Sequence, residues 1–460
     1  MPPDTTDVYA AIERRRDEFL DDLRQYLAIP SISTDPAYAG EIARCAAFVH
    51  DRLEAAGLSA RTIPTAGHPL VYGEWLGAPG KPTLLFYGHY DVQPPDPLDQ
   101  WRHPPFEPTL EGEDLVARGA TDDKGQSHAH LAAVAAMLAE RGSLPVNVKF
   151  LIEGEEESGG HAIETFVRED AGRVLACDAV VVSDSAMLGP GQPSLLYALR
   201  GIAYFEIEVI GPRIDLHSGT FGGVVQNPLH ALAAILAGFK DPDSGRVLVE
   251  GFYDDVRPLE AWEREEMAAI AIDDAAMAAE LGVPELAGET GYATRERIGG
   301  RPTFDVHGWW GGYAGAGAKT VLPSRAGAKF SMRLVPDQDL TRVADRVVRH
   351  VERVAPRGVQ VEARLLHGAR PLLIDTEGPL IEAAASAMEE VWGRRPVRVR
   401  EGGSIPVVST FVDVLRAPVL LLGFGLPDDR LHAPNEKLDL RQYAGGIRSI
   451  ARLLDRVGAL

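Results

Sequence analysis

Four short apolar runs in this sequence are each followed, within a few residues, by a His, Asp or Glu. The runs cover residues 83–86, 146–152, 179–182 and 419–423. Apolar runs of this length predict strands that are buried on both faces, as in parallel sheets covered by helices. Because parallel strands end at the same edge of a sheet, the residues that follow them come together there. The sequence therefore predicts an α/β domain with a site at one sheet edge.

The residue types at these strand ends are those that bind metal ions. They are His89 and Asp91, the glutamates of residues 153–157, Asp184 and His432, and a loop before the predicted helix 126–140 adds Asp122. Each has a structural explanation when taken alone; Asp122, for example, could simply cap that helix. Taken together, imidazole and carboxylate groups at one sheet edge favour zinc or manganese. We therefore expect a metal site.

The middle of the chain shows a different periodicity. From about Gly201 onward apolar and polar residues alternate, and they alternate again over residues 326–334. This pattern predicts antiparallel strands with one buried face, and helical patterns at 228–239 and 340–354 would cover that face. The strand and helix pattern of the first domain resumes near residue 371.

These patterns predict the domain organisation. A chain of 460 residues is expected to form two domains. We expect an α/β domain with a mostly parallel sheet flanked by helices, built from residues 1–200 and 371–460. A smaller α+β domain with an antiparallel sheet, residues 201–370, interrupts it.

Composition excludes several kinds of partner. The net charge of −21, without a Lys/Arg-rich run, argues against nucleic acid. No apolar run is long enough to cross a bilayer, so no membrane partner is expected. The first residues lack the basic and apolar segments of a secretory signal, and the only cysteines, Cys45 and Cys177, form no CxxC pair. A cytoplasmic location is the prediction.

The motifs resemble a known family. Residues 88–94, 119–125, 153–159, Ser183-Asp184 and His432 follow the order found in the dinuclear zinc peptidase and amidohydrolase family. That family includes dipeptidases, carboxypeptidase G-like enzymes, aminoacylases and desuccinylases. The resemblance implies a zinc-exopeptidase-like fold and two divalent ions, zinc or manganese.

The resemblance also implies roles for individual residues. Asp122 would bridge the two metals, and the remaining ligands would be His89, Asp184, Glu157 and His432. Glu156 would be the general base. Asp91 would orient His89, which fixes the imidazole tautomer.

The dipeptidase branch gives the best match. Segments 215–223, 319–323, 332–336 and 401–406 are similar to the lid and substrate-contact segments of that branch. This similarity implies a homodimer in which the lid/dimerisation domain supplies His217 to the other subunit's active site. Thr320, Arg333 and Ser404 would contact a short peptide substrate, Arg333 and Ser404 by holding its carboxylate.

Two alternatives to a dipeptidase remain. The same metal centre could remove the acyl group from N-acyl amino acids, as a deacylase or desuccinylase does, because kinship of fold does not separate these reactions. A non-catalytic binding scaffold is disfavoured because all five ligands and Glu156 are present.

Overall fold

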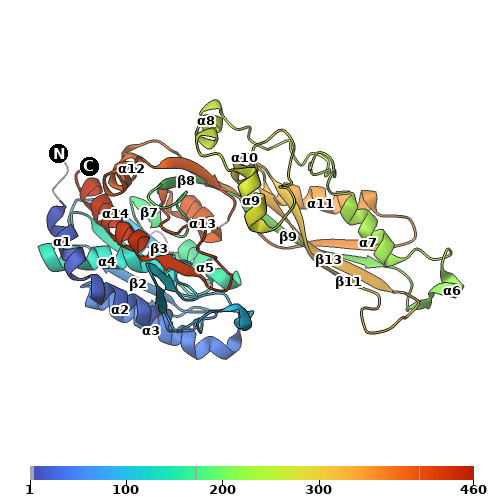
Figure 1. Cartoon of the computed structure of the whole chain (residues 1–460), viewed down its shortest axis with the longest axis horizontal. Coiled ribbons are helices and arrows are strands. Elements are labelled where there is room, and N and C mark those ends of the chain that lie inside the picture. The colour runs from blue at the N-terminus through green and yellow to red at the C-terminus, as the bar shows by residue number, and fades with distance from the viewer. Residues whose placement is uncertain (1–4, 171–172, 404) are drawn as a thin grey trace. The chain divides into compact units, whose positions relative to one another are not determined.

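The computed structural model describes residues 5–170, 173–403 and 405–460. The chain divides into two compact units (Figure 1). Unit 1 comprises Met1–Leu196, Ile374–Arg398 and Thr410–Leu460, and unit 2 comprises Tyr197–Leu373 and Val399–Ser409. The predicted fold class, an α/β domain interrupted by a domain with an antiparallel sheet, is confirmed.

A mixed sheet forms the centre of unit 1. Seven of its nine strands lie in the order β1-β2-β6-β3-β7-β17-β8. These strands are β1 (Ser59–Ile63), β2 (Leu70–Trp75), β6 (Asn147–Glu153), β3 (Thr83–His89), β7 (Ala179–Val182), β17 (Val419–Leu421) and β8 (Ser194–Leu199). β6, β3, β7 and β17 run parallel, and they are the four strands that the apolar runs predict. β1, β2 and β8 join at the sides in antiparallel pairs.

Helices cover the sheet of unit 1. They are α1 (Thr6–Arg14), α2 (Arg16–Leu27), α3 (Ala39–Ala55), α4 (Lys124–Arg141), α5 (Ala162–Asp170), α12 (Pro379–Trp392), α13 (Pro406–Leu415) and α14 (Leu440–Gly458). α4 packs against β3 on one side and against α1, α2 and α14 on the other. α4 is buried on most sides because it lies inside the unit, whereas α3 contacts β1 and β2 along one face.

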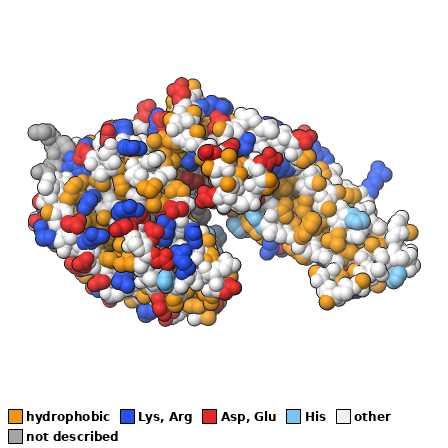
Figure 2. All heavy atoms as spheres, in the orientation of Figure 1, with side chains coloured by type: hydrophobic (Ala, Val, Ile, Leu, Met, Phe, Trp, Pro, Cys, Tyr) orange, Lys and Arg blue, Asp and Glu red, His pale blue; other side chains and the backbone are white. Residues whose placement is uncertain are grey.

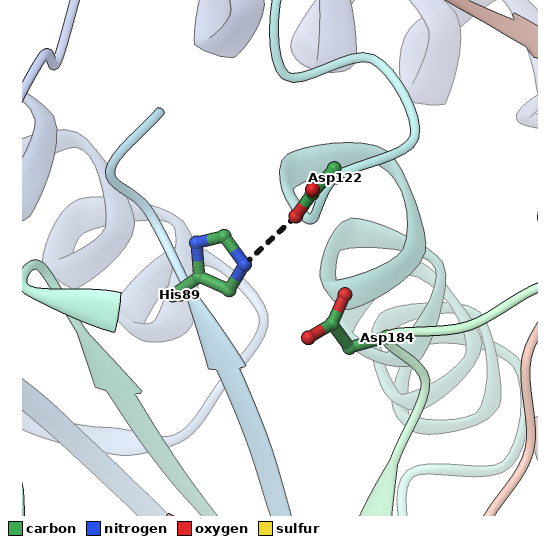
Figure 3. A group of neighbouring side chains, drawn as sticks. All are labelled: His89, Asp122 and Asp184. Atoms are coloured by element: carbon green, nitrogen blue, oxygen red, sulfur yellow. Dashed lines mark hydrogen bonds and ion pairs between the residues drawn. The ribbon is translucent and has the colours of Figure 1, made fainter. Parts of the chain in front are cut away.

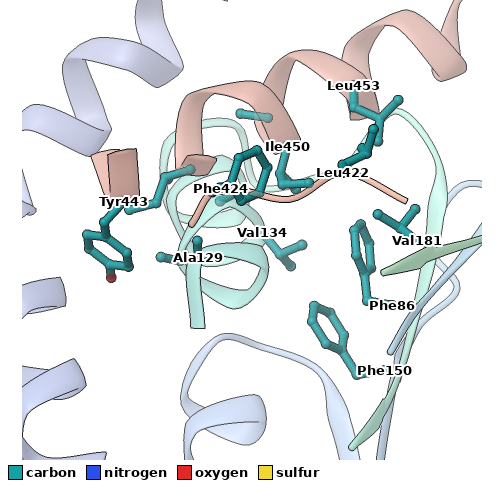
Figure 4. Close-up of a cluster of buried hydrophobic side chains, with 14 of the residues drawn as sticks. Phe86, Ala129, Val134, Phe150, Val181, Leu422, Phe424, Tyr443, Ile450 and Leu453 are labelled. Carbon is teal, nitrogen blue, oxygen red and sulfur yellow. The ribbon is translucent and has the colours of Figure 1, made fainter. Parts of the chain in front are cut away.

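The core of unit 1 fills the space between the parallel strands and helices α4 and α14. Phe86, Phe150 and Val181 project from the strands toward Val134 of α4 and Ile450 of α14 (Figure 4). The rings of Phe86 and Phe150 stack with their centroids 5.0 Å apart. Burial of these large side chains fixes the register of the strands, and with it the positions of the residues that follow them.

A small sheet links two distant parts of the unit 1 sequence. Its order is β18 (Lys437–Asp439), β5 (Asp114–Val116) and β4 (Thr109–Glu111). In the antiparallel pair of β18 and β5, Lys437 lies opposite Val116. The loop before β18 therefore lies beside the loop that follows β5.

Unit 2 contains a four-stranded antiparallel sheet of order β11-β13-β9-β14. The strands are β11 (Thr303–Gly311), β13 (Arg325–Leu334), β9 (Gly201–Ile210) and β14 (Gln360–Ala369). Strict alternation along β9 buries one face, where Phe205 and Phe330 pack beneath α7 (Pro228–Ala237) and α11 (Leu340–Val354). The polar residues of the alternation lie on the opposite face.

Shorter elements complete the chain. They are α6 (Ser218–Phe221), α8 (Ala261–Ala269), α9 (Asp274–Leu281), α10 (Thr294–Gly300), β10 (Leu216–His217), β12 (Val321–Leu322), β15 (Leu372–Leu373), β16 (Val397–Glu401), and the single-turn helices η1 (Pro36–Tyr38), η2 (Leu98–Gln100) and η3 (Glu156–Ser158). Within the described part of the chain, none of the helices combines the length and apolar character needed to cross a bilayer.

Candidate metal centre

Five residues predicted as ligands meet at one edge of the sheet of unit 1. His89 is the last residue of β3, and Asp184 lies two residues beyond β7. Glu157 belongs to the single turn η3 after β6, and Asp122 lies in the turn immediately before α4. His432 lies in the loop between β17 and β18. The edge of the parallel sheet thus gathers side chains that are as much as 343 residues apart in the sequence, from position 89 to position 432.

The ligand atoms form two groups of three. His89, Asp122 and Asp184 each offer one atom within 4.8 Å of the others, and their side chains point toward one another (Figure 3). Asp122, Glu157 and His432 form the second group by the same measure. Asp122 is therefore the one member that the two groups share.

The two carboxylate oxygens of Asp122 face different histidines. Oδ1 lies 3.1 Å from Nε2 of His89, and Oδ2 lies 2.9 Å from Nε2 of His432. Nε2 of His432 is also 3.3 Å from Oε2 of Glu157. A carboxylate with one oxygen toward each side is suited to bridge two cations.

Asp91 supports two of the candidate ligands. Its backbone carbonyl oxygen lies 3.1 Å from Nδ1 of His89, and its Oδ1 lies 3.4 Å from the same nitrogen, on the side of the ring opposite Asp122. Its Oδ2 accepts a hydrogen bond of 3.0 Å from the backbone N–H of Glu157. With Nδ1 facing a carboxylate, Nε2 is the ring nitrogen available to a metal.

The electrostatics of the cluster favour cations. Burial raises the pKa of Asp184 to about 7, and the negative charge of Asp122 adds to this effect. Burial also raises the pKa of Glu156 well above its usual range, an effect that His89 opposes and Asp184 reinforces. Carboxylates crowded in a buried site repel one another unless positive charge neutralises them. Two imidazoles and three carboxylates are a donor set that fits two zinc or manganese ions.

The histidines supply part of that positive charge in the protein alone. Burial lowers the pKa of His89, but hydrogen bonds with Asp122 and Asp91 outweigh burial and raise it well above its usual value. Hydrogen bonds with Asp122 and Glu157 raise the pKa of His432 to about 10. The carboxylates around each imidazole therefore stabilise a positive charge at its position. A bound cation would be stabilised by the same carboxylates.

Several supporting residues escaped the sequence analysis. Nε2 of Gln93 donates a 2.8 Å hydrogen bond to Oε2 of Glu157. Nε2 of the buried His130 lies 2.6 Å from the hydroxyl of Ser183, the residue before Asp184. Gln93 lies shortly after His89 in the sequence, and this position could have indicated that it lies near the candidate ligands. Nothing in the sequence links His130 to Ser183.

Two predicted substrate residues lie together in unit 2. His217 ends β10 opposite Val321 of β12, and the backbone N–H of Ser218 donates to the carbonyl of Thr320 at 3.0 Å. The side chain of His217 is exposed, and its Nδ1 accepts the N–H of Gly219.

Arg333 lies elsewhere in unit 2. It is the penultimate residue of β13, opposite Ile202 of β9, and is half-buried. β13 begins at Arg325, which follows β12 closely in the sequence, and Arg333 lies eight residues further along the strand. Eight residues of extended strand span about 26 Å. One chain therefore does not bring His217 and Arg333 together. Ser404 lies outside the described residues.

Comparison with known proteins identifies the class and then the family. A two-unit α/β enzyme fold with a candidate two-metal centre is typical of metal-dependent exopeptidases. The family model described as peptidase family M20/M25/M40 matches residues 85–456. The chain belongs to this family, so the predicted enzyme class, a metal-dependent peptidase, is confirmed.

Individual relatives cover nearly the whole chain. The chain is 34% identical to the Cys-Gly metallodipeptidase DUG1 of Candida albicans, over 98% of this chain and 97% of that protein. It is 33% identical to the Beta-Ala-His dipeptidase of Homo sapiens, over 96% and 91% of the two chains. The structure of the dipeptidase Dug1p from Saccharomyces cerevisiae matches with a TM-score of 0.88 at 31% identity and covers all of both chains. The predicted similarity to the dipeptidase branch is confirmed.

The shared position of Asp122 predicts unequal effects of removing single ligands. Asp122→Ala should weaken zinc binding at both positions, whereas Asp184→Ala and His432→Ala should each weaken one. For the affected ion we expect a loss greater than the roughly 10–100-fold that removal of an outer-sphere partner costs. Zinc titration with metal analysis measures this, and Glu111→Gln, which breaks an exposed pair with Arg102, is the control. Two tightly bound zinc ions in Asp122→Ala would contradict a shared carboxylate.

Proposed function

We propose that this protein is a two-metal dipeptidase, which hydrolyses the amide bond of dipeptides or similar short peptides that carry a free carboxylate. The observation that carries the proposal is the pair of three-residue groups that share Asp122. The names of the relatives, a Cys-Gly metallodipeptidase and a Beta-Ala-His dipeptidase, support the choice of dipeptides.

Zinc is the proposed metal, with manganese as the alternative. His89, Asp184 and Oδ1 of Asp122 would hold one ion, and Oδ2 of Asp122, Glu157 and His432 would hold the other. When bound, such ions polarise an amide carbonyl and lower the pKa of water. The geometry of Asp91 supports its proposed role, because its backbone carbonyl and its Oδ1 both face Nδ1 of His89 while Nε2 faces Asp122.

Glu156 is the proposed general base. It lies in the single turn η3 next to the ligand Glu157, and the charges of His89 and Asp184 both act on its carboxyl group. Its carboxylate accepts a proton from the attacking water and returns it to the amine that leaves. Glu156 has this task, and Glu157 does not, because Glu157 is already engaged by Gln93 and His432.

The role of Glu156 is tested by Glu156→Ala. The variant should lose about 10²–10⁴-fold in kcat, since that is the usual contribution of a positioned acid–base group. It should retain both zinc ions by metal analysis, because Glu156 is not a ligand. Glu164→Gln, on the following helix α5, is the matched control and should behave as wild type. Substantial hydrolysis by Glu156→Ala would exclude Glu156 as the base.

Arg333 and Ser404 are proposed to bind the carboxylate of the substrate. A guanidinium pairs with a carboxylate through two parallel hydrogen bonds. A protein with a net charge of −21 also needs such a local cation to attract an anionic peptide end.

A homodimer is proposed because His217 and Arg333 are too far apart in one chain. A dipeptide spans only about 7 Å when extended, compared with the roughly 26 Å between the two ends of β13. If both residues contact one substrate, His217 must come from a second copy of the chain, together with its neighbour Thr320. There it would polarise the carbonyl of the bond that is cleaved.

The surface of unit 2 supports a protein partner. Its exposed large hydrophobic residues include Ile214, Phe221, Val224, Trp309, Trp310, Tyr313 and Leu366. On the visible face of the part that carries β9, β11 and β13, uncharged surface predominates, whereas charged side chains are interspersed over the visible face of unit 1 (Figure 2). Exposed apolar residues in this number are typical of interaction surfaces.

The location that we propose for the dimer is the cytoplasm.

Exchange of subunits tests the contribution of His217. His217→Ala should lower kcat about 10²–10³-fold, as loss of one oxyanion donor does, without a change in zinc content. A mixture of His217→Ala with Glu156→Ala should recover about a quarter of the wild-type activity, because half of the randomly exchanged dimers contain one intact site. Unaltered activity of His217→Ala, or no recovery in a mixture shown to exchange, would contradict the cross-subunit role.

A substrate panel separates the proposed activity from deacylation. With added zinc or manganese, we expect turnover of dipeptides such as Cys-Gly and β-alanyl peptides to exceed that of N-acyl amino acids. The reverse order of kcat/KM would favour a deacylase or desuccinylase. Binding of these compounds without hydrolysis of any of them would favour the non-catalytic scaffold.

A further inference from the structure

Glu436 is a fully buried carboxylate that the proposed chemistry does not use. It lies four residues after His432 and is 0% exposed. The loop that carries both residues, between β17 and β18, contains no helix or strand. The side chain of His432 is itself 54% exposed, so burial of that side chain does little to hold it in place.

The carboxylate of Glu436 accepts four hydrogen bonds from the segment that carries Asp122. Oε2 accepts from Nη1 of Arg118 at 2.8 Å and from the backbone N–H of Gly119 at 2.9 Å. Oε1 accepts from the backbone N–H of Thr121 at 3.0 Å and of Asp122 at 3.1 Å. Each oxygen thus binds two donors.

These bonds reach the shared ligand directly. The last of the four donors is the backbone N–H of Asp122 itself, so the position of its Cα depends on Glu436. The main chain of Glu436 adds a further link, because its carbonyl accepts the N–H of Ala117 at 3.0 Å. The pairing of β18 with β5 begins at the next residue, where Lys437 lies opposite Val116.

A second carboxylate braces the same two segments. Oδ2 of the buried Asp429 accepts from the hydroxyl of Thr121 at 2.8 Å and from the N–H of Leu426 at 2.7 Å. The loop around His432 is therefore attached to the segment around Asp122 both before and after the histidine, by Asp429 and by Glu436. The 2.9 Å approach of Nε2 of His432 to Oδ2 of Asp122 lies between these two attachments.

We infer that Glu436 is a positioning residue for the two-metal centre: it sets the distance between Asp122 and His432, and so the second metal position. The inference rests on the proposed function, because it requires that those residues bind metal. A carboxylate is required since both of its oxygens must accept. A glutamine has only one oxygen, so its NH₂ group would face one of the two pairs of donors. That pair, either Arg118 and Gly119 or Thr121 and Asp122, would lose its acceptor.

The test compares two buried glutamates. Glu436→Gln should weaken binding of the second zinc ion about 10–100-fold, the usual effect of losing a partner that orients ligands. Glu263→Gln is the matched control, because Glu263 is equally buried and accepts from the buried Arg400, but lies in unit 2. Zinc competition titration gives the affinities, and circular dichroism melts give the stability of both variants. We expect both variants to have a lower melting temperature than the wild type, and only Glu436→Gln to lose zinc affinity.

The outcomes are distinguishable. Wild-type zinc affinity in folded Glu436→Gln, or an equal loss in Glu263→Gln, would overturn the positioning role and leave the proposed function intact. Failure of the wild-type protein to bind two zinc ions would overturn the metal centre and this inference with it. If Glu436→Gln does not fold, Glu436→Asp takes its place: it keeps the charge but is one methylene too short to reach all four donors. Unchanged zinc affinity in folded Glu436→Asp would then overturn the inference.

Discussion

The repulsion between carboxylates at the end of the parallel sheet is the constraint on which the site depends. Asp122, Asp184, Glu156 and Glu157 interact electrostatically, and burial, nearly complete for Asp122 and partial for the other three, removes part of the water that would otherwise solvate them. Such a cluster is stable only if positive charge and hydrogen-bond donors surround it. The protein supplies His89 and His432 on the two sides of Asp122, and Gln93 donates a hydrogen bond to Glu157. A hard divalent cation in each group would complete the neutralisation.

The parts of this arrangement that follow from local pattern could be predicted from the sequence. The apolar runs identified β3, β6, β7 and β17, and these form the parallel centre of the sheet. Since parallel strands end together, the strand-end residues had to be neighbours, and His89, Asp122 and Asp184 do meet. Alternation along β9 likewise predicted the half-buried sheet of unit 2. The hydrophobic pattern predicts these strands because it is determined by whether one or both faces of a strand are buried.

The supporting contacts could not be predicted in the same way. Glu436 and Arg118 are 318 residues apart, and a buried Glu after a loop has no periodicity that marks it. His130 and Ser183 come from a helix and a strand end, and their contact depends on where α4 lies relative to the end of β7. The distance between His217 and Arg333 also could not be predicted, because it depends on the pairing of β10 with β12 and on the length of β13, which the family resemblance does not give. These contacts depend on which helices, strands and loops pack together, and the sequence pattern of each element alone does not show this.

In the proposed enzyme, the two units would carry out tasks that need different degrees of structural precision. Metal ligands must be held within a few tenths of an ångström, and unit 1 holds them at the ends of buried parallel strands and by buried carboxylates such as Glu436 and Asp91. Residues that recognise a substrate must allow entry and release, and the residues proposed for this task in unit 2, His217 and Thr320, lie on exposed segments that pair through two residues. His432 combines both requirements, since its side chain is exposed while the loop that carries it is anchored on either side. In the proposed metal centre, an exposed ligand on a firmly attached loop would allow substrate to reach the second metal position without loosening the ligand.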